Sequence, residues 1–129
     1  MQKLVLDTNI LVGSLLTEGI SFLVVEKIFE KKITIIYSSA VLEEYTEVLS
    51  NKKFEKKFSQ ADAMKLIAII QEIGLLSEPK ESIVIFKHEA DRKFYDLAKD
   101  NGAILITRNL KHFPREKWIL SPQDAISVI

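Results

Sequence analysis

The segment KLVLDTN at residues 3–9 joins an apolar run to three polar residues. Residues 3–7 are short and apolar, which is typical of a buried strand. Asp7, Thr8 and Asn9 belong to the residue types that begin helices or occupy turns. The segment therefore predicts a strand that ends at Asp7 and leads at once into a short helix over residues 10–16.

The rest of the chain continues this alternation of strands and helices. Apolar, β-branched runs predict further strands at 33–37, around 83–86, at 103–107 and at 118–120. Apolar residues at helical spacing predict helices at 21–31, 40–49, 60–73 and 89–99, with a last helix from Ser121-Pro122. Strands that are apolar on both faces are typical of a parallel sheet covered by helices on both sides.

Composition limits the class of protein. The chain has 129 residues, 47% of them hydrophobic and 28% charged, which suits one domain over residues 1–129 and neither disorder nor a membrane span. The absence of cysteine excludes disulfides, thiolate metal sites and a cysteine nucleophile. Eighteen basic and eighteen acidic residues cancel, so the net charge gives no support to a nucleic-acid-coating protein. We expect a cytoplasmic protein, because no secretory signal begins the sequence.

Three acidic residues are predicted to lie at one edge of the sheet. Asp7 ends the first strand, and Glu44 and Asp91 fall in the first turns of two helices, on their apolar sides. No basic residue shares those apolar stripes, so we expect these carboxylates to lack a basic partner. Inward carboxylates without a partner favour a divalent cation, and oxygen ligands suit Mg²⁺ or Mn²⁺. Such an ion assists the hydrolysis of phosphodiester bonds.

Each of these acids also has a purely structural explanation. Asp7 would serve as a helix N-cap, Asp91 as an acid favoured by the helix dipole, and Glu44 as a half-exposed residue near the start of its helix. Glu43 is the rival to Glu44, and helical phase favours Glu44. Asp96 lies on a different face from Asp91, so we expect it to be solvated. The coincidence of three acids at one edge favours the metal site.

Four motifs, in order and spacing, resemble those of PIN domains between residue 3 and about residue 120. They are LVLDTNILV at 4–12, SSAVLEEYTEVL at 38–49, DRKFYDLA at 91–98 and AILITRN at 103–109. The resemblance implies an α/β fold, a three-layer α/β/α sandwich with a mostly parallel central sheet. It also implies a metal-dependent ribonuclease, most similar to the PIN proteins regarded as toxins of toxin–antitoxin pairs.

The resemblance carries over the family's acidic residues one by one. They correspond to Asp7, Glu44 and Asp91, which would be both the catalytic residues and the ligands of Mg²⁺ or Mn²⁺. The fourth acid of the family corresponds to Asn109, which supplies an amide oxygen but no charge. This departure puts a second metal ion in doubt more than the first.

Polar residues beside the acids would complete the site: Thr8, Asn9, Thr107 and Arg108. The first two match polar residues of the family that would orient Asp7 or the attacking water. Arg108 and Lys111 are candidates for a contact with phosphate, unless they only form a surface loop. His88 and His112 lack metal-ligand spacing, and we expect them to be surface residues.

The implied partners are an RNA substrate, an antitoxin protein and a second copy in a homodimer, with no membrane. The Lys- and Phe-rich segment 51–58 would bind RNA phosphates, or would be a solvated connection with its two Phe in the core. The alternative function is a degenerate PIN domain that binds RNA or protein without cutting, because Asn109 replaces an acid. An aspartyl-phosphate phosphatase would need a second aspartate where this chain has Asn9. A dinucleotide-binding domain would need a glycine-rich turn after the first strand, which is lacking. A receiver domain would need paired acids near the start of the chain, and these are lacking as well.

Overall fold

The computed structural model describes residues 2–129. Its strands are β1 Lys3–Leu6, β2 Thr34–Tyr37, β3 Leu75–Leu76, β4 Ile104–Ile106 and β5 Ile119–Leu120. Its α-helices are α1 Thr8–Leu16, α2 Ile20–Lys31, α3 Ser39–Leu49, α4 Gln60–Ile73, α5 Arg92–Asn101 and α6 Pro122–Ile126. Short 3₁₀ turns are η1 Lys52–Phe54, η2 Glu89–Asp91 and η3 Leu110–His112.

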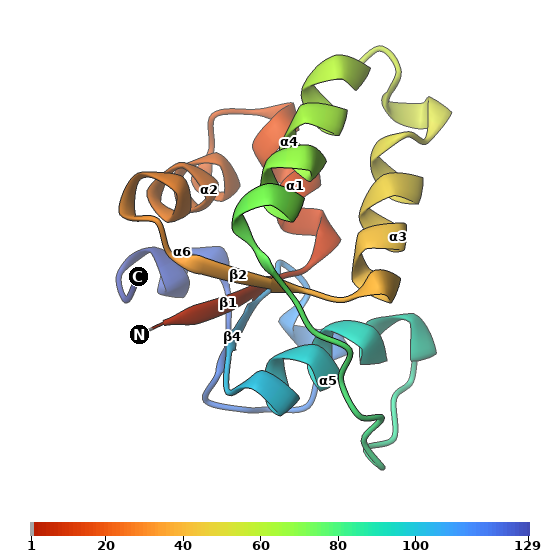
Figure 1. Cartoon of the computed structure of the whole chain (residues 1–129), viewed down its shortest axis with the longest axis vertical. Helices are drawn as coiled ribbons and strands as arrows, with labels where there is room; N and C mark the ends of the chain where they lie inside the picture. The colour runs from red at the N-terminus through yellow and green to blue at the C-terminus, as the bar shows by residue number, and fades with distance from the viewer. Residues whose placement is uncertain (1) are drawn as a thin grey trace.

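The strands form one parallel sheet in the order β3-β2-β1-β4-β5. Helices α1 to α4 lie on one side of it and α5 on the other (Figure 1), while α6 packs against α2. The central strand β1 has almost no exposed surface from Leu4 to Leu6, because helices cover both of its faces. The predicted three-layer α/β/α sandwich is confirmed.

Local capping explains where several helices begin. The hydroxyl of Ser38 accepts a hydrogen bond from the N–H of Val41 at 3.1 Å, and the hydroxyl of Ser59 caps α4 in the same way. Helix α5 ends at Gly102, whose φ of +59° is the left-handed conformation that favours glycine. These signals are local, and the Ser38 cap places the first turn of α3 directly after β2.

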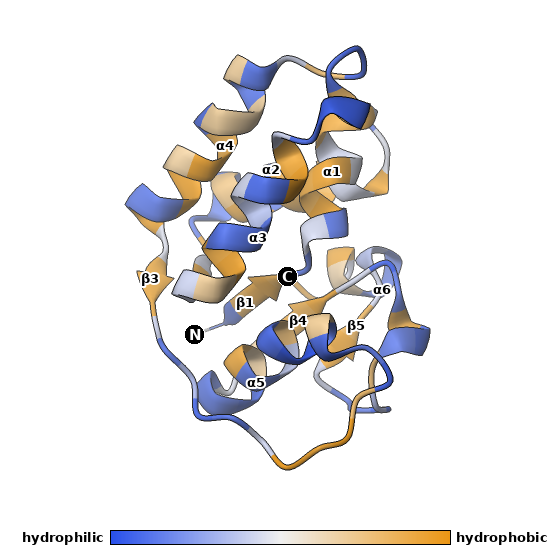
Figure 2. Ribbon diagram, turned by 90° about the vertical axis from the view of Figure 1, so that its right-hand side faces the viewer, coloured by the Kyte–Doolittle hydropathy of each residue, from blue (hydrophilic) through white to orange (hydrophobic). Residues whose placement is uncertain are grey.

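The predicted strand at 83–86 is wrong. The sheet instead takes β3 from Leu75–Leu76, which pairs with Ile36 and Tyr37 directly after α4 ends at Gly74. A side chain at Gly74 would lie 2.5 Å from the carbonyl oxygen of Ile70, so only glycine allows this close turn into the sheet. Residues 83–86 lie in the connection from β3 to α5, at the lower edge of Figure 2.

Asp96 is not solvated, contrary to our expectation. Only 4% of it is exposed, and its Oδ2 accepts a hydrogen bond from the backbone N–H of Ser82 at 3.1 Å. The connection between β3 and α5 runs over this face of α5 and covers it. Helical phase within α5 could not show that another segment buries the residue.

No single helix among residues 2–129 is both long and apolar enough to cross a membrane. Helices α1 and α2 reach the required length and hydropathy only when taken together, and they are bent by 104°.

Candidate nuclease site

Asp7 lies at the carboxyl end of β1 and is only 7% exposed. Its Oδ2 accepts hydrogen bonds from the hydroxyl of Thr107 at 2.7 Å and from Nδ2 of Asn9 at 3.3 Å. Asp7 occupies the N-cap position of α1, but its side chain makes no capping hydrogen bond. The N-cap explanation therefore does not account for the buried carboxylate.

The electrostatics of Asp7 link the three predicted acids. Burial raises the pKa of Asp7 to about 6, against the opposing effect of the Thr107 hydrogen bond. The negative charges of Glu44 and Asp91 contribute smaller parts of this increase. The three carboxylates thus lie near enough to repel one another, which is the situation that a bound cation relieves.

Glu44 has a basic partner, which corrects the expectation that the acids are unpaired. Its Oε1 forms an ion pair with Nζ of Lys93 at 2.8 Å, and its Oε2 accepts a hydrogen bond from the hydroxyl of Thr8. Lys93 comes from α5 and is not part of the apolar stripe of that helix, so helical phase did not indicate this ion pair. Glu43 points into solvent, as the helical phase of α3 predicted.

Asp91 ends η2 at the first turn of α5 and is half-buried. Its Oδ2 is buried without a hydrogen bond of good geometry, although Nδ1 of His112 lies 3.4 Å away. Burial raises the pKa of Asp91, the nearby His112 and His88 lower it, and Glu44 raises it. A buried carboxylate oxygen without a donor is costly, and a cation is one way to satisfy it.

The two histidines are exposed, as predicted, but sequence reasoning missed their position at this site. The rings of His88 and His112 are 5.3 Å apart and tilted by 41°, and His112 contacts Asp91. One stands before η2 and the other in η3, so the fold rather than the sequence brings them together. The one available signal was His88 three residues before Asp91, which by itself is weak.

The loop after β4 is bound to the start of α1. The N–H of Arg108 donates to Oδ1 of Asn9 at 3.1 Å, and the N–H of Asn109 donates to the hydroxyl of Thr107 at 3.0 Å. Thr107 thereby accepts from the loop while it donates to Asp7. The polar residues Asn9 and Thr107 lie around Asp7, and Thr8 holds Glu44.

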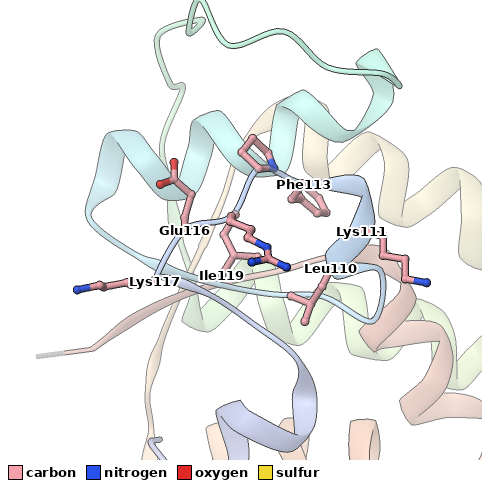
Figure 3. Close-up of a pocket in the computed structure, with 8 residues that line it drawn as sticks. Leu110, Lys111, Phe113, Glu116, Lys117 and Ile119 are labelled. Carbon is pink, nitrogen blue, oxygen red and sulfur yellow. The ribbon is translucent and has the colours of Figure 1, made fainter.

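Two cavities lie along this loop. One of about 460 Å³ is lined by Arg108 to His112 and by Ile20 and Ser121 to Gln123. The other, of about 680 Å³, extends along residues 110–119, where Figure 3 shows Lys111 and Lys117 on opposite sides. The basic residues Arg108 and Lys111 both line the smaller cavity, together with His112, which contacts Asp91.

The residues suit an oxygen-ligated cation only in part. Among residues 2–129, no three histidine or carboxylate side chains are grouped closely enough to bind one ion. The unsatisfied Oδ2 of Asp91 and the buried charge of Asp7 fit Mg²⁺ or Mn²⁺. Glu44, by contrast, is already bound to Lys93 and Thr8.

Comparisons with known proteins agree with this fold. Residues 3–111 match the family model of the PIN domain. An uncharacterized protein of Methanocaldococcus jannaschii is 27% identical over 107 residues, which cover 81% of this chain and 69% of that protein. No solved structure matches the chain significantly. Because the family match extends from β1 to η3 and includes all three acids, the chain belongs to the PIN domain family.

Proposed function

We propose that this PIN domain is a ribonuclease that hydrolyses RNA phosphodiester bonds with the help of Mg²⁺ or Mn²⁺. PIN domains are generally nucleases that bind RNA and use a divalent metal. The observation that supports the proposal is the buried carboxylate of Asp7, whose pKa is raised to about 6 by burial and by two neighbouring acids. Such a site is poised to take up a cation.

Asp7 and Asp91 are the residues that would hold the ion, with the amide oxygen of Asn109 as a neutral addition. The hydrogen bonds from Thr107 and Asn9 both reach Oδ2 of Asp7, so they fix the orientation of the carboxylate. When bound, the ion would supply positive charge that activates water and stabilises the leaving oxygen.

Glu44 would join the site only after Lys93 moves away. In that case Lys93 would turn toward the substrate, where its charge suits an RNA phosphate. Arg108 and Lys111 offer further positive charge beside the cavity of about 460 Å³. The segment 51–58 lies at the far end of α3 from Ser39 (Figure 1), so it is not part of this phosphate path.

The biological setting that we propose follows the PIN subgroup that the motifs resemble. The protein would act in the cytoplasm as the toxin of a toxin–antitoxin pair, and an antitoxin protein would mask its site. Induced expression in a host lacking the antitoxin should then arrest growth, and the Asp91→Asn variant should not. Growth that is unaffected by the wild-type protein would argue against the toxin role.

A second candidate function is a PIN domain that binds RNA without cutting it. The ion pair between Glu44 and Lys93 favours it, because it neutralises one of the acids. Asn109 favours it as well, because it removes the charge of a fourth. Binding of RNA that is equally tight with Mn²⁺ and with chelator, without any cleavage, would support this function.

Cleavage of labelled single-stranded and hairpin RNAs by the purified protein tests the proposal. We expect cleavage in Mn²⁺ or Mg²⁺ and none in chelator. Glu44→Gln should lower the rate by about 100-fold if Glu44 joins the site. Glu43→Gln is the matched control, because this neighbour points into solvent and should leave the rate unchanged.

A further inference from the structure

The connection from β3 to α5 contains an extended segment, residues 81–87, that we call the strap. Its exposed side chains are Glu81, Ile83, Ile85 and Lys87, and those turned toward the protein are Ser82, Val84 and Phe86. This strict alternation is the pattern of a strand with one face on the protein. Ile83 is 99% exposed and Ile85 is 93% exposed, which is unusual for two large apolar side chains so close together.

The backbone groups of the strap form hydrogen bonds along one edge only. The N–H of Ser82 donates to Asp96, and the guanidinium of Arg92 donates to the carbonyl oxygens of Ser82 and Val84. Alternate residues of a strand direct their backbone groups to opposite edges. Ile83 and Ile85 therefore direct theirs away from α5, and no hydrogen bond within residues 2–129 reaches them. An open strand edge of this kind is a template for pairing with another strand.

We infer that the strap pairs with the strap of a second copy of this chain, antiparallel and around a two-fold axis at Val84. This register places Ile83 opposite Ile85 of the partner subunit and Glu81 opposite Lys87 of the partner subunit. The apolar side chains cover one another, and the charges that meet are opposite. The two-fold axis repeats every pair, so each favourable contact occurs twice.

The neighbouring registers lack this complementarity. Centring the pair on Ile85 places Glu81 opposite Glu89 of the partner subunit and Ile83 opposite Lys87 of the partner subunit. Centring it on Ile83 places Glu81 opposite an apolar side chain, Ile85 of the partner subunit. The register at Val84 alone matches charge with charge and isoleucine with isoleucine, so the sequence of the strap specifies a second copy as its partner.

The position of the strap allows this contact. Figure 2 shows the hydrophobic part of the connection at the lower edge of the molecule, on the α5 side and away from α1 to α4. Arg92 links it to α5 directly beside Asp91, so a paired strap would also steady the first turn of α5. The inference stands on the strap alone and does not depend on the proposed nuclease activity.

Sedimentation equilibrium of the full chain over a concentration series tests the inference. We expect a monomer–dimer equilibrium that Ile85→Asp abolishes. Lys87→Glu should weaken the dimer roughly tenfold, because it sets like charges opposite each other twice. Adding Glu81→Lys to Lys87→Glu should restore the affinity. Leu23→Asp on α2, where the leucine is 45% exposed, is the matched control and should leave the dimer intact.

Disulfide trapping checks the register, because the chain has no cysteine of its own. A mixture of Ile83→Cys and Ile85→Cys proteins should form covalent dimers on mild oxidation, whereas each protein alone should form few. Thermal unfolding shows whether each variant is folded. A monomer at every concentration, or a dimer that neither Ile85→Asp nor Lys87→Glu weakens, would overturn the inference, and so would efficient trapping of each cysteine protein alone.

Discussion

The substitution Asp7→Asn removes the buried negative charge and keeps the shape of the side chain. The amide oxygen of asparagine can still accept the hydrogen bond from Thr107. Folding raises the pKa of Asp7 from 3.8 to about 6. A shift of roughly two units corresponds to about 3 kcal/mol. We therefore expect the variant to be more stable than the wild type at neutral pH when no metal is present.

The sign of the pH dependence follows from the direction of this shift. Between about pH 4 and about pH 6 the folded wild type holds a proton on Asp7 that the unfolded chain has lost. The wild type therefore loses stability as the pH rises through this window, and its loss is nearly complete by about pH 7. The variant lacks this loss, so its advantage should grow from near zero at about pH 4 to as much as about 3 kcal/mol at about pH 8.

Urea unfolding in chelator, followed by circular dichroism, measures this difference at both pH values. Adding Mn²⁺ at about pH 8 should stabilise the wild type and not the variant, because a ligand of the folded state adds to its stability. A variant that is less stable than the wild type at about pH 8 would show that the carboxylate is structural. If the variant is more stable than the wild type by the same amount at about pH 4 and at about pH 8, the buried charge of Asp7 is not the cause of the difference.

Three further substitutions test the rest of the site. Asp91→Asn should leave the fold stable in chelator and abolish the stabilisation by Mn²⁺, and a fall of several degrees in its melting temperature would mark Asp91 as structural. Lys93→Gln should free Glu44 and raise Mn²⁺ affinity roughly tenfold in calorimetric titration, while unchanged affinity would show that Glu44 stays outside the site. Asn109→Asp should change cleavage little, because most positions around Mg²⁺ are normally taken by water or substrate. An inert wild type together with an active Asn109→Asp variant would favour the non-cleaving function.

The elements that the sequence predicted well are those whose signals are local. Three polar residues directly follow strand β1, and Ser38 and Ser59 cap the helices that come after them. These features depend on neighbours along the chain, so the order of elements and the parallel sheet could be predicted. The positions of Asp7, Glu44 and Asp91 at the carboxyl edge follow from the same order.

The features that the sequence did not predict depend on contacts between distant segments. Residues 83–86 have the alternation of a strand, but Leu75–Leu76 already occupies the place beside β2. The same connection buries Asp96, which its own helix would leave in water. Lys93 reaches Glu44 from a different helix, and helical phase describes only one helix at a time.

The rate of RNA cleavage by wild-type and Asp7→Asn protein, measured as Mn²⁺ is titrated, tests the central claim most directly. We expect the wild-type rate to rise with Mn²⁺ and to saturate, to vanish in chelator, and to fall at least about 100-fold in the variant. Both proteins should remain folded under the conditions of the assay. Cleavage that persists undiminished in folded Asp7→Asn protein, or a folded wild type that cuts no RNA at any Mn²⁺ concentration, would contradict the claim.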